Sequence, residues 1–219
     1  MSKVSPIKPV LIYLYGFPGS GKSYLGRNLA KELQAAYINT DRLRGQLFNR
    51  PRYDEHENAT VDFLIKYLAK EFLGVGVSVI YDGDLSKLTQ RREVRELART
   101  EKAESLLIWL QIDADSAFTR TQQRDRRTTD DKYATVQTRQ SFNSQIAKMQ
   151  NPRDEDYIVI SGKHAFATQR SSIINRLYQL GLVAGGSLQH KVAKPELVNL
   201  VPGIYTDQMD LSRRNIPIR

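Results

Sequence analysis

The sequence of 219 residues predicts an α/β fold, in which a parallel sheet of about five strands carries helices on both faces. Two observations predict this class. Short apolar runs rich in strand-forming residues alternate with longer segments in which apolar residues return at the helical period. Glycine or aspartate follows several of these runs, at the edge where such sheets bind ligands. The predicted strands are residues 10–15, 36–39, 77–81, 105–112 and 157–161.

Helices are predicted between and after these strands. Thr40 is expected to cap the second helix, and Pro51 to stop it. The third helix, of roughly fifteen residues, is expected to end at Gly74 and Gly76. The predicted helices are residues 22–33, 40–49, a segment that includes 61–72, 89–101, 113–127, 134–149 and 166–180.

The chain is predicted to contain one domain, residues 10–183, between a short mobile lead-in, 1–9, and an irregular arm, 184–219. It has no cysteine, no apolar run near the length of a membrane span and no signal-peptide core at its start. These features exclude disulfides and predict a cytoplasmic protein that does not enter a membrane. The oligomeric state stays open.

Glycines cluster directly after the first predicted strand. Residues 16–23, GFPGSGKS, fit G-x-x-x-x-G-K-[ST], the P-loop pattern, between a strand and a helix as the motif requires. Glycines let backbone N–H groups turn toward an anion, and the following helix adds partial positive charge. The sequence therefore predicts the three-layer sandwich of P-loop NTPases. The predicted nucleotide-binding residues are Gly16, Pro18, Gly19, Ser20, Gly21, Lys22, Ser23 and Tyr24.

The two last residues of the P-loop predict the cofactors. Lys22 is expected to reach the β- and γ-phosphates of ATP, and the Ser23 hydroxyl to bind Mg²⁺. ATP is the expected nucleotide, and GTP stays open.

Asp41 and Arg44 form a D-x-x-R pattern after the second predicted strand. One helical turn places both side chains on the same face. Asp41 is suited to accept the proton of an attacking hydroxyl, and Arg44 to bind an acceptor phosphate through two hydrogen bonds. The alternative is a carboxylate at a helix start and a surface arginine.

Asp82 ends the third predicted strand, where a buried carboxylate needs a partner. A Mg²⁺-bound water or the acceptor hydroxyl would serve, so Asp82 is a candidate for both the metal and the substrate site. The alternative is a structural cap of the next turn. Asp84 is expected to face solvent.

Arg120 and Arg124 are spaced to lie on one face of the fifth predicted helix, before a polar gap at 128–132. Such arginines can close over the triphosphate as a lid and neutralise its charge. The alternative, a solvated basic face, is preferred for Arg126 and Arg127. A solvated face is also expected for a second basic cluster, formed by Arg91, Arg92 and Arg95.

With these residues placed, the chain resembles the small AAA-type ATP-binding P-loop kinases, which include polynucleotide 5′-hydroxyl kinase domains and zeta-toxin-like kinases. The resemblance covers roughly residues 9–181 and rests on the P-loop, the D-x-x-R pattern, residues 79–85, Arg91 with Arg92, and the R-x-x-x-R of the lid. It implies that Asp41 is the general base and that Arg44 binds phosphate. No phosphatase domain with a D-x-D nucleophile accompanies it.

A net charge of +9 favours a polyanionic partner, either nucleotide phosphates or nucleic acid, although a generally basic composition explains it equally well. Together, these features predict ATP- and Mg²⁺-dependent transfer of the γ-phosphoryl group to a polynucleotide 5′-hydroxyl. The alternatives are a kinase of a small metabolite, nucleoside or nucleotide-sugar, and a non-catalytic nucleotide-binding switch, which has no need of Asp41.

Overall fold

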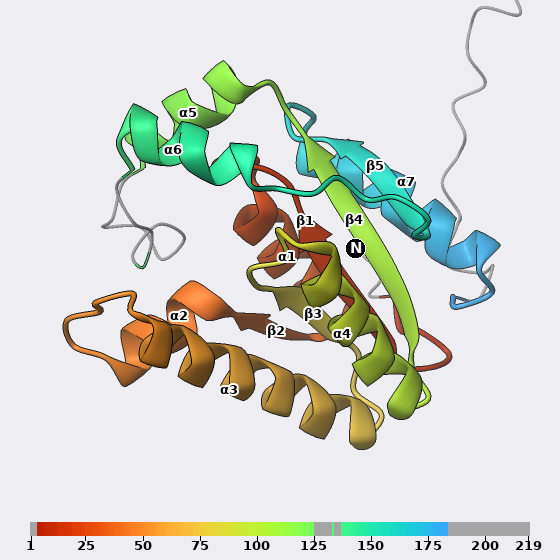
Figure 1. Cartoon of the computed structure of the whole chain (residues 1–219). Coiled ribbons are helices and arrows are strands. Elements are labelled where there is room, and N and C mark those ends of the chain that lie inside the picture. Colours follow the sequence, from red (N-terminus) through yellow and green to blue (C-terminus); the bar gives the residue numbers. More distant parts are fainter. Residues whose placement is uncertain (1–3, 125–132, 134–136, 184–219) are drawn as a thin grey trace, which may run out of the picture. The chain divides into compact units, whose positions relative to one another are not determined.

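A computed structural model of the chain describes residues 4–124, 133 and 137–183, and their elements are labelled in Figure 1. Five parallel strands form one sheet in the order β2-β3-β1-β4-β5. The strand order places β1 at the centre, and all six of its residues are buried. The strands are β1 (Val10–Tyr15), β2 (Ala36–Asn39), β3 (Val79–Asp82), β4 (Glu104–Gln111) and β5 (Tyr157–Ser161).

Helices cover both faces of this sheet, which confirms the predicted fold class (Figure 1). The alternation of side chains along β1 explains the two layers. Leu11 and Tyr13 join a core cluster with Ile65 of α3 and Val94 of α4, while Leu14 lies against Gly26 of α1 on the other face. The helices are α1 (Lys22–Leu33), α2 (Thr40–Leu47), α3 (Glu55–Gly74), α4 (Leu88–Thr100), α5 (Ala114–Gln122), α6 (Arg139–Ala147) and α7 (Phe166–Gln179).

Helix ends differ from the prediction where side chains cap them. Asn39, rather than Thr40, caps α2, because its side chain accepts a hydrogen bond of 2.8 Å from the backbone N–H of Arg42. Asp54 caps α3, which is 20 residues long rather than fifteen. Helix α6 begins after its cap Thr138, later than predicted.

The lead-in is attached to the domain from Val4 onward. The Val4 side chain is buried, and its backbone N–H donates to Glu32 O at 3.0 Å. The N–H of Ile7 donates to Leu182 O at 2.9 Å. The lead-in thus contacts the domain at Val4 and Ile7. The predicted arm, 184–219, lies outside the described residues. Within the described ranges, no helix combines the length and the apolar character needed to cross a membrane.

Arg91 is fully buried, so the predicted solvated face is wrong for this residue. Its Nε lies 2.9 Å from Oε2 of Glu155, whose side chain is equally buried, and its Nη1 donates to Leu85 O at 2.9 Å. The guanidinium also lies over the ring of Tyr15. Arg91 stands in the same buried stripe of α4 as Val94 and Ala98, and Glu155 neutralises it there. The pair fixes the loop between β3 and α4, which borders the site.

Candidate active site

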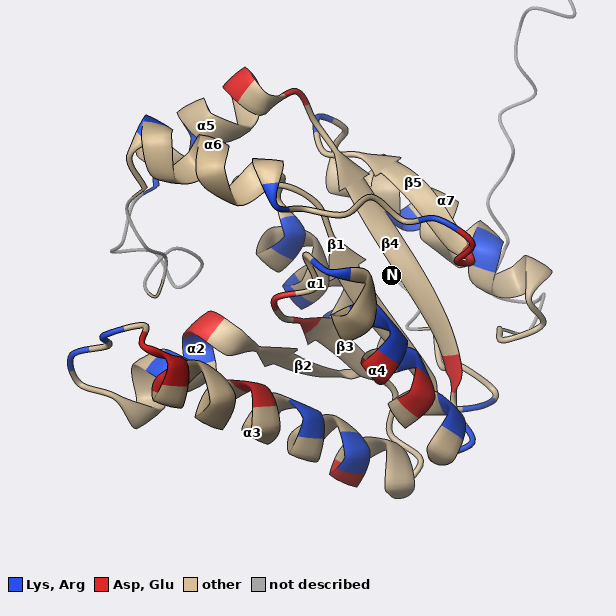
Figure 2. Cartoon of the chain, viewed as in Figure 1, with Lys and Arg blue, Asp and Glu red and all other residues tan. Residues whose placement is uncertain are grey.

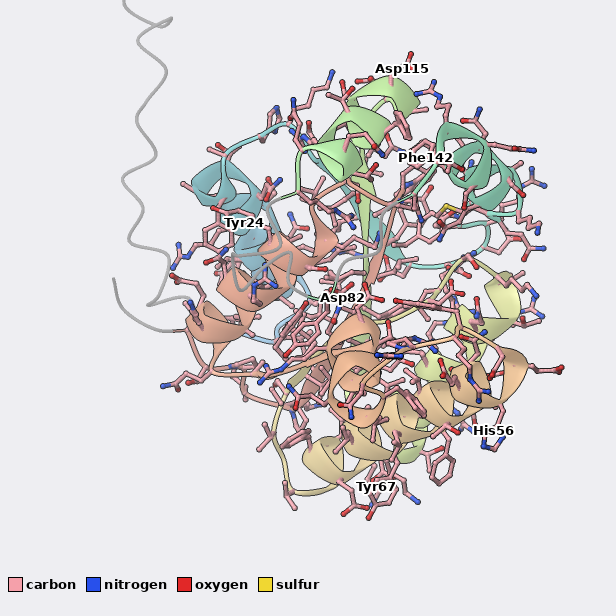
Figure 3. All side chains as sticks on the ribbon, turned by 90° about the vertical axis from the view of Figure 1, so that its left-hand side faces the viewer. Tyr24, His56, Tyr67, Asp82, Asp115 and Phe142 are labelled. Carbon is pink, nitrogen blue, oxygen red and sulfur yellow. The ribbon has the colours of Figure 1, made fainter. Side chains whose placement is uncertain are left out.

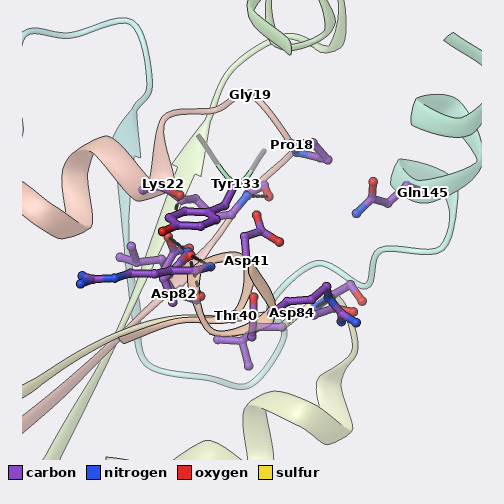
Figure 4. Close-up of a pocket in the computed structure, with 18 of the residues that line it drawn as sticks. Pro18, Gly19, Lys22, Thr40, Asp41, Asp82, Asp84, Tyr133 and Gln145 are labelled. Carbon is purple, nitrogen blue, oxygen red and sulfur yellow. Dashed lines mark hydrogen bonds between the residues drawn. The ribbon is translucent and has the colours of Figure 1, made fainter. Parts of the chain in front are cut away.

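One open cleft lies at the carboxyl ends of β1, β2 and β3, and Figure 4 shows part of its lining. Asp82 lies near the centre of the molecule, whereas labelled residues such as His56, Tyr67 and Asp115 lie at the periphery (Figure 3). The predicted site residues that line the cleft are Gly16, Pro18, Gly19, Gly21, Lys22, Ser23, Tyr24, Asp41, Arg44, Asp82, Arg120 and Arg124. The structure therefore brings most of the predicted set together.

The P-loop leaves the start of α1 open to an anion. Gly21 precedes the helix with φ of 101° and gives it no side-chain cap, in contrast to the side-chain caps of α2 and α3. Lys22 Nζ donates to the carbonyl oxygens of Gly16 and Phe17, at 2.8 and 3.0 Å, which holds the ammonium over the loop. Burial lowers the pKa of Lys22, while the carboxylate of Asp82 opposes this shift. An uncapped helix start beside a lysine fits a nucleotide phosphate.

Ser20 lies beneath the loop rather than in the cleft. Its side chain is fully buried, its backbone N–H donates to Phe17 O at 3.0 Å, and its Oγ has no hydrogen-bond partner among the described residues. Its predicted role in nucleotide binding stays a prediction.

Gly19 is the P-loop position where the structure most clearly requires glycine. A Cβ there would overlap the carbonyl oxygen of Ala117, and the φ of +81° lies in the left-handed region. We expect Gly19→Ala to lose nucleotide binding and to lower the free energy of unfolding, because the loop must move away from α5. Denaturant titration and nucleotide binding test this.

Gly76→Ala is the matched control for this prediction. Gly76 has the same φ of +81°, but a Cβ there meets nothing within 4 Å. This variant carries only the backbone strain, about 1 kcal/mol, and keeps nucleotide binding. Equal stability losses in the two variants would show that the overlap at Gly19 is relieved without cost.

Asp82 is held by three donors that converge on one oxygen. Its Oδ2 accepts hydrogen bonds from Ser23 Oγ at 2.7 Å, from Tyr37 OH at 2.7 Å and from Asn39 Nδ2 at 2.8 Å (Figure 4). The side chain is almost completely buried. The sequence analysis missed Tyr37 and Asn39, although Asn39 is the register partner of Asp82 at the ends of neighbouring strands.

This cluster fits the predicted magnesium site in its chemistry. A serine hydroxyl next to a carboxylate supplies the hard oxygen ligands that Mg²⁺ prefers, with waters and phosphate oxygens completing its shell. Burial, and then the charge of Asp82, raise the pKa of Tyr37, so its phenol stays a donor. Tyr37 and Asn39 thereby orient the carboxylate beside Ser23.

We expect Tyr37→Phe to lower the apparent affinity of the protein for Mg²⁺. The variant keeps the ring but removes one hydrogen bond to a charged group, a difference of about 2 kcal/mol. The Mg²⁺ concentration for half-maximal activity should therefore rise by more than about tenfold, with little change at saturating Mg²⁺. Tyr178→Phe, at an exposed position of α7 outside the cleft, is the control. An unchanged Mg²⁺ titration for Tyr37→Phe would show that the phenol does not orient Asp82.

Asp41 lies in the first turn of α2, and its carboxylate points into the open space of the cleft (Figure 4). Although the side chain reaches solvent, protein surrounds it on most sides. Burial, and then the negative charge of Asp82, raise the pKa of Asp41, and Arg124, Lys22 and Arg44 oppose the shift. A raised pKa at a cleft carboxylate suits a group that takes up a proton.

Arg44 is not the surface arginine of the alternative interpretation, because it is only 8% exposed. Its Nη1 lies 3.4 Å from Oε2 of Glu57, its Nη2 donates to Asn58 Oδ1 at 2.6 Å, and its guanidinium lies 4.6 Å from the ring centroid of Tyr53. Glu57 is itself buried and also accepts from the backbone N–H groups of Arg52 and Tyr53. The phosphate-binding role of Arg44 stays a prediction.

The two predicted lid arginines do not share a helix. Helix α5 ends at Gln122 with Gln123 as its cap, so Arg124 follows the helix. The prediction that both lie on one helical face is therefore wrong. Arg120 Nη1 donates to the carbonyl oxygen of Gly162, directly after β5, at 2.8 Å. Both arginines line the cleft, whereas residues 125–132 of the predicted lid lie outside the described residues.

The fold and this cleft define a P-loop protein. Residues 11–152 match the AAA domain family, and the chain belongs to this family. No curated protein matches it.

Several solved structures have the same fold. One is Chaetomium thermophilum Kti12 in complex with ADP-AlF3, with 18% identity, a TM-score of 0.61, and coverage of 80% of this chain and 100% of that chain. Another is the Mycobacterium tuberculosis APS kinase CysC with AMPPNP and APS, with 16% identity, a TM-score of 0.59, and coverage of 78% and 98%. A third is a gluconokinase from Sinorhizobium meliloti 1021, with 18% identity, a TM-score of 0.57, and coverage of 78% and 93%. At these identities the likeness concerns the fold.

Proposed function

We propose that this protein is a kinase that moves the γ-phosphoryl group of ATP to a hydroxyl group of a small molecule. One observation carries the proposal: Asp41 projects into the cleft that Lys22, Ser23 and Asp82 also line. The residues proposed to bind phosphate, to bind Mg²⁺ and to act as base thus line one cleft, where an acceptor hydroxyl could reach the γ-phosphate. A non-catalytic switch would need only the groups that bind phosphate and Mg²⁺.

The proposed transfer assigns a task to each group. Lys22 and the amides of the P-loop hold the phosphates, and Ser23 and Asp82 hold Mg²⁺, which when bound neutralises charge on the phosphate oxygens. The acceptor oxygen forms a bond to the γ-phosphorus. The bond from this phosphorus to the β,γ-bridging oxygen breaks, and ADP leaves. The hydroxyl proton passes to the carboxylate of Asp41.

The acceptor is where the sequence prediction needs correction. The resemblance favoured a polynucleotide 5′-hydroxyl, but the solved structures with this fold include a sugar kinase, a gluconokinase and an APS kinase. Their acceptors, as named, are small molecules, and they support the small-molecule alternative instead.

The test is a panel of hydroxyl compounds incubated with Mg²⁺ and γ-labelled ATP. The panel holds neutral sugars and polyols, sugar acids, nucleosides and a 5′-hydroxyl oligonucleotide, each with wild type and Asp41→Asn. We expect label on a small compound and its loss in Asp41→Asn. Label on the oligonucleotide alone, or on no member while ATP binds, would contradict the proposal.

A further inference from the structure

We propose that the acceptor is an uncharged polyhydroxylated compound, such as a sugar or polyol, rather than a phosphorylated or carboxylated one. The inference rests on the proposed function and concerns the part of the cleft opposite the P-loop. We call this part the acceptor half and define it as the lining from α2, α3 with the loop before it, and the loop from β3 into α4. Its chemistry differs from that of the phosphate-binding half.

The acceptor half is placed to receive the hydroxyl compound. Asp41, the candidate base, lies at its border with the P-loop. Asn58 and Asp62 of α3 and Asp84 of the β3–α4 loop line the same cleft. A molecule held there presents a hydroxyl between Asp41 and the γ-phosphate.

The charge of the acceptor half does not favour an anion. Among the described residues that line it, Arg42 and Arg44 are the cations, and Asp41, Glu55, Asp62 and Asp84 are the carboxylates. Lys66 neutralises Asp62 at 2.7 Å, so Asp41, Glu55 and Asp84 carry the negative charge of this half. Figure 2 shows acidic positions on α2, α3 and the loop between β3 and α4. An anionic acceptor would approach these carboxylates in addition to the triphosphate.

Arg44 does not reverse this balance, because Glu57 already neutralises it. The two side chains are 9% and 3% exposed, and Asn58 occupies a further donor of the guanidinium. An arginine whose charge is compensated inside the protein offers hydrogen bonds but little net attraction for a second anion. It therefore suits a neutral oxygen better than a phosphate.

The remaining groups match the hydroxyls of a polyol. Asn58 supplies an amide, and Asp62 and Asp84 supply acceptors, while Gln90 of α4 and Gln145 of α6 add amides elsewhere in the cleft. The lining can therefore both donate to and accept from hydroxyl groups. Tyr53 adds an aromatic ring, 44% exposed, that covers Arg44. Several planar polar side chains and one aromatic face suit the alternating polar and apolar surface of a sugar or polyol.

Matched acceptor pairs test the inference. We would measure kcat/KM with gluconamide against gluconate, and with glucuronamide against glucuronate, since each pair keeps every hydroxyl group and differs in the charge of one group. We expect the neutral member to be preferred by about tenfold or more, the effect of one unfavourable charge pair at an intermediate dielectric. A preference for the anionic member would overturn the inference and leave the proposed function standing. Transfer to no member of these pairs or of the wider panel would contradict the proposed function itself.

Asp84→Asn tests whether the acceptor half causes the preference. The side chain is exposed and lines the cleft, and asparagine can still accept the turn hydrogen bond from Ser86 N. We expect the anionic member of each pair to gain about threefold or more relative to the neutral one, with unchanged ATP affinity. Glu71→Gln, an equal charge change at an exposed position of α3 outside the cleft, should leave the ratio unchanged. An unchanged ratio in Asp84→Asn, or an equal shift in Glu71→Gln, would overturn the electrostatic explanation.

Discussion

Replacing Lys22 with alanine is expected to lower kcat/KM for phosphoryl transfer by about a hundredfold to a thousandfold, the loss typical of one preorganised donor to the transition state. The ammonium lies over the P-loop on two backbone carbonyls, where the developing charge of the transferred group would lie. Because Lys22 is buried against the P-loop, water compensates poorly for its removal. Steady-state kinetics at saturating Mg²⁺ measures the effect.

Lys31→Ala is the control for this variant. Lys31 belongs to the same helix, α1, but is exposed at its other end. It should retain full activity. Wild-type kinetics for Lys22→Ala, with an intact fold, would mean that the transferred phosphate does not bind at the P-loop.

Asp41→Asn is expected to lower kcat by about a hundredfold to ten-thousandfold, the usual contribution of a positioned general base. Asparagine keeps the size of the side chain and removes the proton acceptor. Nucleotide affinity should not fall, because a negative charge near the triphosphate is lost. Asp115→Asn is the control, because Asp115 also lies in the first turn of a helix, α5, but outside the cleft. If Asp41→Asn kept the full rate, Asp41 would not be the base. The feature that distinguishes this protein from a nucleotide-binding switch would then be lost.

The same residue determines the pH profile. A base must be ionised to act, so kcat/KM of the wild type should rise as pH increases through the pKa of Asp41. Burial and Asp82 raise that pKa, and the rise should therefore lie above the usual range of an aspartate. In Asp41→Asn, this rise of kcat/KM with pH should be absent. A rise at acidic pH that persists in the variant belongs to another group.

The sequence was most informative where local chemistry decides the structure. The strands 10–15, 36–39 and 157–161 and the helix 22–33 begin and end as predicted, because apolar runs and glycines mark their limits. The P-loop pattern likewise placed Lys22 and Ser23 in the cleft. These features depend on neighbours in the chain.

Features that depend on distant partners were predicted poorly. The sequence predicts Arg91 to lie at the surface, because its partner Glu155 is 64 positions away in the chain and comes beside it only in the fold. Tyr37 and Asn39 gain their role only when β2 pairs with β3 and brings them to Asp82. The partners of Arg44, Glu57 and Asn58, likewise came only from the fold. In each case the polar residue type was visible, whereas its partner came from the fold.

The stoichiometry of ATP consumption tests the central claim most directly. With Mg²⁺, ATP and a neutral sugar or polyol that accepts label, we would quantify ADP, phosphate ester and inorganic phosphate in the same reaction. A kinase that uses Asp41 as base yields ester in amounts equal to ADP, and Asp41→Asn yields little of either. ADP matched by inorganic phosphate, regardless of the hydroxyl compound present, would contradict the account and identify the cleft as that of a nucleotide hydrolase or switch.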